Sequence, residues 1–209
     1  DTAIYGISNG LNKLLGIILI PLYANYIPIS DYGILAVLEI TITFLISVLH
    51  FGIIPGHQRF FYLEKDNNSY GQYLFSIFTT LLFLSLTIIL VFIVNSSILS
   101  SIILGKTIYK ELFKITMYIT LTEILFLLPL QILQFEGKPI FYLLLNFIKL
   151  IIALILTIYF VVSLRMSIKG ILMARLLGNS LITLIAILIT IIPKCDFKFN
   201  IQKIKTTLK

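Results

Sequence analysis

Charged residues are scarce in this chain. Asp, Glu, Lys and Arg together make up 12% of its 209 residues, whereas soluble domains contain roughly 25%. Hydrophobic residues make up 59%, and the mean hydropathy is +1.06. So little charge cannot cover a globule with polar surface in water. The composition therefore excludes an ordinary soluble domain and predicts an integral membrane protein.

Cysteine and tryptophan are also scarce. The chain has one cysteine, Cys195, and no tryptophan, which excludes an internal disulfide and a multi-cysteine metal site. It has no Gly-x-x-x-x-Gly-Lys-Ser/Thr loop, no His-Glu-x-x-His pair and no Gly-x-Ser-x-Gly elbow, the motifs of nucleotide hydrolysis and of common hydrolases. We therefore expect no metal, no cofactor and no enzymatic activity.

The chain is rich in apolar runs of about 20 residues, the length at which an α-helix crosses about 30 Å of hydrocarbon. The runs must be helices, because strands of a membrane barrel are only ~10 residues long and alternate strictly. We predict an all-α integral membrane fold, a six-helix transmembrane bundle over residues 1–192. Its predicted spans cover about residues 4–27, 34–54, 73–94, 112–135, 140–162 and 171–192.

Polar segments separate these spans. We predict an exposed loop at residues 57–72, a short interfacial segment at 98–104 and a tight, solvated hairpin at 136–139. The net charge of +7 is dispersed along the chain, so we assign it to membrane lipids and cytoplasmic loops and expect no nucleic-acid partner. The basic tail, residues 193–209, places both ends of the chain in the cytoplasm by the positive-inside rule.

Ionisable residues inside the predicted spans are the main functional signal, since each costs about 2.5–3.5 kcal/mol to insert at a helix centre. They are Lys13, Glu39, Glu123, Lys149 and Arg175. Glu39 and Arg175 lie about one turn inside a span, where snorkelling to the headgroups explains them equally well. For Lys13, Glu123 and Lys149 a functional cavity is favoured over a structural ion pair between helices.

Each of these residues belongs to a polar stripe at helical spacing. Stripes on five helices predict a shared, hydrated interior. They comprise Asn9, Lys13 and Gly16 with Asn12 alongside; Glu39, Thr43, Ser47 and His50; Thr116, Thr120 and Glu123; Asn146, Lys149, Ala153 and Thr157; and Arg175, Asn179, Thr183, Ala186 and Thr190.

Short stretches along almost the whole chain carry a family resemblance by their order and spacing. They read LLGIILIPLYA at residues 14–24, ISDYG at 29–33, FGII at 51–54 before RFFY at 59–62, LQILQ at 130–134 before GKP at 137–139, and IKGI at 168–171. In this order they resemble the polysaccharide-transporter branch, the Wzx-type O-antigen flippases, of the multidrug/oligosaccharidyl-lipid/polysaccharide exporter superfamily.

The resemblance implies a MATE-like fold of two bundles around a central cavity. This chain would be the first bundle, and residues 193–209 would be the cytoplasmic linker to a missing second bundle, unless a second copy replaces it. The implied activity is flipping of an undecaprenyl-diphosphate-linked oligosaccharide across the cytoplasmic (inner) membrane of a bacterium. Alternating access of the cavity would drive this step in O-antigen or capsule biosynthesis.

Candidate roles for individual residues follow from this implied substrate, since ammonium and guanidinium groups can replace the water that a diphosphate loses. Lys13 and Lys149 would contact the diphosphate or acidic sugars, with Asn12 and Asn146 beside them. Arg59 would lie at the cytoplasmic mouth and Arg175 towards the far side. The acids Glu39 and Glu123 would bind a coupling ion or balance these cations.

Three alternatives stay open. A cation-coupled multidrug exporter of the same superfamily would have a cavity dominated by acids, whereas lysine is at least as prominent here. A membrane polysaccharide polymerase or glycosyltransferase would need a large polar loop with clustered acids or arginines. A non-catalytic scaffold subunit would have a cavity sealed by lysine–glutamate ion pairs.

Overall fold

The computed structural model describes residues 25–64 and 70–196, and over these residues it contains helices and no strand. Five helical segments there are long and apolar enough to cross a membrane. The expected helical membrane protein is thereby confirmed. Most of the first predicted span, residues 4–27, lies outside the described residues, so the count of six spans stays a prediction.

The candidate spans are built from α2 (Ile29–Leu49), α4 (Tyr70–Val94), α6 (Lys110–Phe135), α7 (Pro139–Ile158) and α8 (Ser167–Thr190). The 3-10 turn η1 (Thr107–Tyr109) precedes α6, the π-helical turn η2 (Tyr159–Ser163) ends α7, and the 3-10 turn η3 (Ile192–Lys194) follows α8. The short helix α5 (Ser96–Leu104) joins α4 to η1 and corresponds to the predicted interfacial segment.

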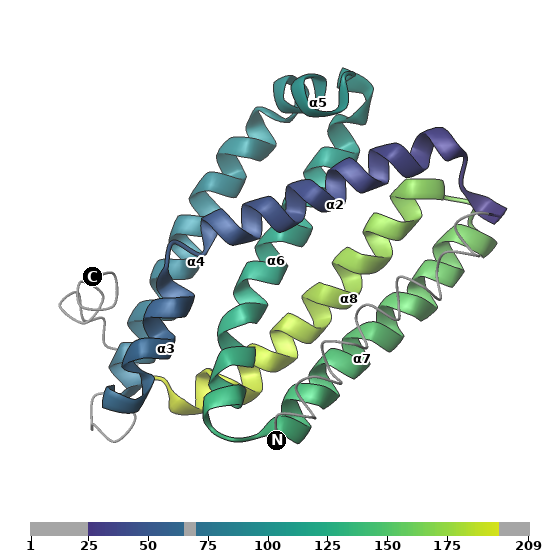
Figure 1. Cartoon of the computed structure of the whole chain (residues 1–209). Helices are drawn as coiled ribbons and strands as arrows, with labels where there is room; N and C mark the ends of the chain where they lie inside the picture. Colours follow the sequence, from purple (N-terminus) through teal and green to yellow (C-terminus); the bar gives the residue numbers. More distant parts are fainter. Residues whose placement is uncertain (1–24, 65–69, 197–209) are drawn as a thin grey trace.

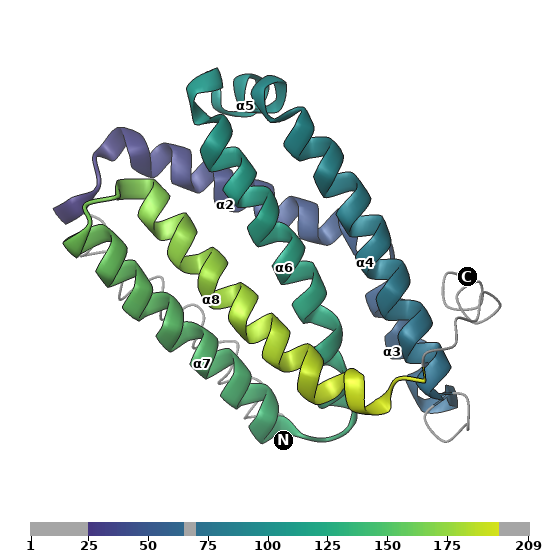
Figure 2. The same ribbon diagram turned by 180° about the vertical axis from the view of Figure 1, so that it is seen from behind.

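Four of these helices lie side by side in the order α4, α6, α8, α7, and α2 crosses one face of the row (Figures 1 and 2). The central helix α6 buries polar side chains that lipid would not tolerate, among them Thr116, Thr120 and Gln131. The outer helices expose large apolar residues such as Phe83 and Ile155. Polar residues thus gather inside the row.

Helix α2 packs through one apolar stripe. Leu38, Ile42 and Leu45 are buried at helical spacing, whereas Ile40 and Phe44 on another side are exposed. Its first turn is attached to the start of α8, because the Ser167 hydroxyl donates a 2.9 Å hydrogen bond to the Asp31 carboxylate. The two helices therefore begin at the same end of the bundle (Figure 1).

The predicted loop at residues 57–72 is wrong at both of its described ends, 57–64 and 70–72. Helix α3 (Ile53–Glu64) occupies its first half, and residues 70–72 open α4. The chain bends before α3 at Gly52, whose φ of 71° suits glycine. Pro55 lies in the first turn of α3, where a missing N–H breaks no helical hydrogen bond. The second span correspondingly runs from Ile29 to Leu49 and not over residues 34–54.

The composition of α3 explains this error, because the helix carries several polar residues while its inner face is buried. His57 and Phe61, four residues apart, are both 0% exposed, and the His57 ring centroid lies 5.7 Å from that of Tyr73 and 6.1 Å from that of Phe135. The His57 Nδ1 lies 3.3 Å from the Tyr73 hydroxyl. Burial lowers the pKa of His57 to about 4.

We expect this histidine to make the fold acid-sensitive. An unfolded histidine titrates near its ordinary value of 6.5, so between that pH and about 4 the unfolded chain binds the extra proton. Unfolding free energy should therefore fall as the pH drops through this window, by at most about 3 kcal/mol. The His57→Phe variant should flatten the slope in detergent unfolding curves, and His50→Gln should keep it. An unchanged slope in His57→Phe would contradict the assignment.

The hairpin between α6 and α7 is a second correction. Glu136 was expected to be solvated, but its side chain is 14% exposed and pairs with Lys138 Nζ at 2.9 Å and with Lys194. Burial favours the protonated acid, but hydrogen bonds from Lys194 and Lys138 hold the pKa of Glu136 below its usual value. Glu136 therefore ties the end of α8 to the hairpin.

The start of α4 contacts the same segment. Gln72 donates a 3.0 Å hydrogen bond to the Asp196 carboxylate, and Gly71 lies against the backbone of residues 194–196. A Cβ atom on Gly71 would come within 2.6 Å of the Lys194 carbonyl oxygen and 2.7 Å of the Asp196 nitrogen. Only glycine allows α4 and the segment after α8 to approach this closely.

Gly71→Ala should therefore lower the unfolding free energy by about 1–3 kcal/mol, the usual cost of overpacking. The matched control is Gly33→Ala in α2, where a Cβ atom meets nothing within 4 Å and alanine should be neutral or stabilising by up to about 1 kcal/mol. Both values come from the same denaturant titration in detergent. Equal stability of the two variants would show that the Gly71 contact is unimportant.

Candidate functional site

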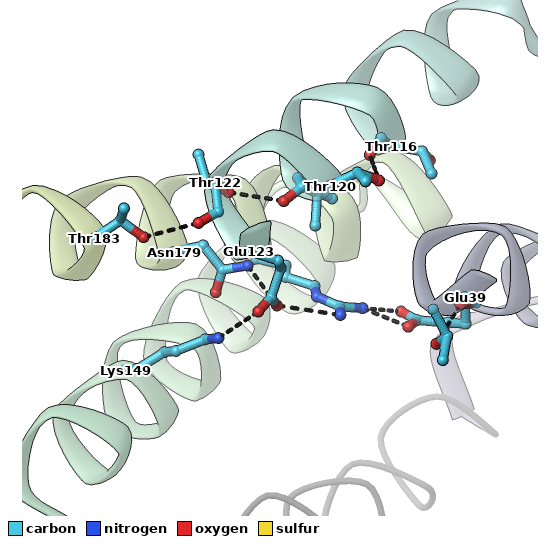
Figure 3. Close-up of polar contacts among 11 residues, drawn as sticks. Glu39, Thr116, Thr120, Thr122, Glu123, Lys149, Asn179 and Thr183 are labelled. Atoms are coloured by element: carbon cyan, nitrogen blue, oxygen red, sulfur yellow. Dashed lines mark hydrogen bonds and ion pairs between the residues drawn. The ribbon is translucent and has the colours of Figure 1, made fainter. Parts of the chain in front are cut away.

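Side chains from four helices form a polar network in the interior of the bundle. It consists of Glu39 on α2, Glu123 on α6, Lys149 on α7, and Arg175 and Asn179 on α8, and we call it the charge network (Figure 3). All five residues belong to candidate membrane spans.

The Glu123 carboxylate is the centre of the charge network. Its Oε2 accepts a 2.9 Å hydrogen bond from Lys149 Nζ, and its Oε1 accepts one of 2.8 Å from Asn179 Nδ2. The Arg175 Nη2 lies 3.3 Å from the same Oε1. One carboxylate on α6 thus holds donors from α7 and α8, and charge-assisted hydrogen bonds of this kind are about twice as strong as neutral ones.

Arg175 extends the charge network to α2. Its Nη2 reaches Glu123, while its Nη1 donates to both carboxylate oxygens of Glu39. The rigid guanidinium plane allows one side chain to bridge two acids in this way. The Arg175 guanidinium therefore does not extend to the lipid headgroups, because it binds two carboxylates inside the bundle.

Lys149 has an aromatic neighbour as well as an acidic one. Its Nζ lies 4.8 Å from the centroid of the Phe126 ring, one turn beyond Glu123 on α6. An ammonium over a ring face is attracted by the ring quadrupole. Glu123 and Phe126 together fix the end of this long side chain.

Exposure increases across the charge network. The side chains of Glu123 and Lys149 are 16% and 17% exposed, that of Arg175 is 28% and that of Glu39 is 42%. The four formal charges cancel, as a low-dielectric interior requires. The α7 side is therefore a tightly enclosed ion pair, and the α2 side is the accessible one.

Most hydroxyl groups in the polar stripes beside these charges donate hydrogen bonds to backbone carbonyl oxygens of their own helix. Thr120 donates to the Thr116 carbonyl oxygen at 2.9 Å and Thr43 to the Glu39 carbonyl oxygen at 3.0 Å, each within its own helix. Thr183 is different, because its hydroxyl on α8 donates to the Thr122 carbonyl oxygen on α6 at 3.2 Å. Within the described residues, the stripes of α6, α7 and α8 are packed against neighbouring side chains, with Thr116, Asn146 and Asn179 buried.

The accessible side of the charge network borders a shallow, open hollow on one face of α2. Glu39, Ile40, Thr43, Phe44 and Ser47 line this hollow, which has a volume of about 420 Å³. We call it the α2 hollow. It combines one carboxylate and two hydroxyls with apolar side chains, and Arg175 lies directly behind Glu39.

The predicted site residues fall into three groups. Glu39, Glu123, Lys149 and Arg175 come together in the charge network. Asn146 is buried, but its amide donates to the Tyr142 carbonyl oxygen at 2.9 Å, and Arg59 is exposed on α3 beside Phe60. Lys13 and Asn12 lie outside the described residues.

Asn179 was not predicted as a site residue, although its place in the Arg175 stripe signalled it. It follows Arg175 by one turn, and its amide orients the Glu123 carboxylate. Its Oδ1 is buried and has no hydrogen-bond partner within the described part of the chain. That oxygen could accept one further hydrogen bond.

Comparisons with protein-family models, curated proteins and solved structures found no match to this chain. The class of this protein is therefore assigned from its fold and its charge network alone. The chain is a multi-pass α-helical membrane protein with a charge-balanced polar network inside its helices.

Removing the central carboxylate should destabilise the bundle. Glu123→Gln leaves Lys149 without its acid, and we expect a loss of about 2–4 kcal/mol of unfolding free energy, since unpaired buried charges are costly. Adding Lys149→Met should recover part of this loss. Unfolding of the purified chain in mixed detergent micelles measures both.

Glu111→Gln is the control, because Glu111 pairs with Lys114 at an exposed position. Exposed pairs contribute about 1 kcal/mol or less. If Glu123→Gln were no more destabilising than this control, the charge network would have no structural role.

Proposed function

We propose that this chain is one bundle of a membrane transporter. Its substrate is an undecaprenyl-diphosphate-linked oligosaccharide, which it passes across the bacterial cytoplasmic membrane as a Wzx-type flippase does. The observation that carries the proposal is the charge network, which places two cations and two carboxylates inside the spans of four helices. No enzymatic step is needed for this activity.

Ionisable groups inside a membrane span support a transport role because they are expensive to keep there. A purely structural bundle could join the same helices through apolar packing, which is often as stable as a buried ion pair. Residues of this kind usually mark the path of a polar substrate or an ion. Lys149 and Arg175 supply the donors that a diphosphate needs on leaving water.

The balance of charges gives this function a physical requirement. The four charges of the network balance, so a diphosphate bound among them would make the network strongly anionic unless an acid is displaced or protonated. Glu39 and Glu123 are the acids concerned. We propose that exchange of these partners accompanies the rocking of two bundles around the site, with a second bundle or a second copy of the chain completing the cavity.

A non-transporting scaffold subunit is the second candidate. The observation that favours it is the complete pairing of the four charges, since Lys149 and Arg175 both already hold carboxylates. A scaffold needs those pairs for assembly alone. Any neutral replacement that keeps the helices together would then leave function intact.

Lys149→Ala tests transport. In cells whose own copy is replaced, with the rest of the reading frame intact, we expect surface polysaccharide to fall about tenfold or more, as for loss of one charge-assisted contact. Lys149→Arg should keep part of the activity. Lys114→Ala, a surface change on α6, should have no effect.

Membrane levels of each variant must be matched by immunoblot, since Lys149 also stabilises the fold. Normal surface polysaccharide in Lys149→Ala at normal level would contradict the proposal. Normal polysaccharide in the neutral pair Glu123→Gln, Lys149→Met would point to the scaffold.

A further inference from the structure

Glu39 differs from the other acid of the charge network in position and access. Its side chain is 42% exposed, whereas that of Glu123 is 16% exposed. Glu39 lies on α2, the helix that crosses the row, and it forms part of the wall of the α2 hollow. It is the acid that can leave the charge network with the least rearrangement.

Arg175 would not be stranded if Glu39 moved away. Its Nη2 would keep the contact with Glu123, and its Nη1, which now binds both oxygens of Glu39, would become available. The geometry that a guanidinium offers to a carboxylate also fits a phosphate oxygen pair. The position of the Glu39 carboxylate is therefore a ready-made place for an oxyanion.

Electrostatics makes the two occupants mutually exclusive. A phosphate-type group beside an ionised Glu39 would meet a like charge at close range in a medium of low dielectric constant. With Glu39 withdrawn, Glu123, Lys149 and Arg175 together carry one net positive charge. That charge attracts the incoming anion, and the withdrawn carboxylate can turn towards the Thr43 and Ser47 side of the α2 hollow.

We propose that Glu39 is a built-in competitor for the anion site on Arg175. Its carboxylate occupies the site when the transporter is empty, and a phosphate-type oxyanion entering through the α2 hollow displaces it. This inference rests on the proposed function, because it names the residue that receives the substrate's phosphate and the residue that controls its affinity. It also explains why a bundle that binds an anion has a carboxylate, Glu39, at the binding position on Arg175.

Binding to the protein purified from its intact reading frame in detergent micelles tests the competition, with farnesyl diphosphate as the lipid-linked probe and inorganic pyrophosphate as the free one. Glu39→Gln keeps the shape of the side chain but loses its charge, and it should bind farnesyl diphosphate about tenfold more tightly than the wild type, the factor for weakening one charge-assisted hydrogen bond. Arg175→Gln should lose binding.

Two further variants guard against misinterpretation. Glu111→Gln removes an equal charge at an exposed position and should bind like the wild type. Glu39→Asp keeps the charge on a side chain that reaches Arg175 less well, so its affinity should lie between those of the wild type and Glu39→Gln. Each variant is checked by thermal unfolding, and if Glu39→Gln does not fold, tighter binding by Glu39→Asp than by the wild type supports the competitor while equal or weaker binding overturns it.

The outcomes separate this inference from the proposed function. Tighter binding by Glu39→Gln, with Glu111→Gln unchanged, supports the competitor. Equal or weaker binding by Glu39→Gln, where the wild type binds, overturns it and leaves the transport proposal standing. No binding to any folded variant overturns both. Equal affinity for pyrophosphate and farnesyl diphosphate supports displacement of Glu39 but contradicts a lipid-linked substrate.

Discussion

Hydrocarbon cannot hydrate an ion, and this constraint governs the arrangement of the bundle around Glu123. A carboxylate in the middle of α6 needs donors from other helices, because its own helix has none to spare. Lys149 from α7 and Asn179 from α8 provide them within 3 Å of its oxygens. Arg175 then requires a second acid, and Glu39 brings α2 across the row. The four helices α2, α6, α7 and α8 are thus joined by charges that neutralise one another.

The same constraint divides the network into an enclosed half and an accessible half. Lys149 lies between Glu123 and the Phe126 ring, so it has both an acid and an aromatic face. Within the described residues the Glu39 carboxylate pairs with Arg175 alone, and it borders the α2 hollow. In a transporter the enclosed half would hold the helices together, while the accessible half would change partners. Lys149 and Glu123 would therefore serve stability, and Glu39 would serve substrate exchange.

Much of this architecture could be read from the sequence, because block length and helical spacing are local properties. The four charged residues of the network were all predicted, and the symmetry of Glu123 and Lys149 about the hairpin at Glu136 even signals their pairing. The sequence could not predict which glutamate pairs with Arg175, since that depends on α2 crossing the row of helices. Residues 57–72 were mistaken for a loop because their polarity outweighed the spacing of His57 and Phe61, whose partners Tyr73 and Phe135 come from distant segments.

The hydroxyl groups on α2 that bond within their own helix affect how firmly α2 is held. Thr43 and Ser47 bond to the backbone of α2 itself and add no cross-link to the row. Two polar side-chain links join α2 to α8, from Asp31 to Ser167 and from Glu39 to Arg175, and they are eight residues apart on each helix. Between and beyond them α2 packs through apolar side chains such as Leu38, Ile42 and Leu45, which impose no directional bond. Helix α2 is therefore held to α8 at two points. If the Glu39–Arg175 pair breaks, the Asp31–Ser167 hydrogen bond remains, and α2 can rotate about that point.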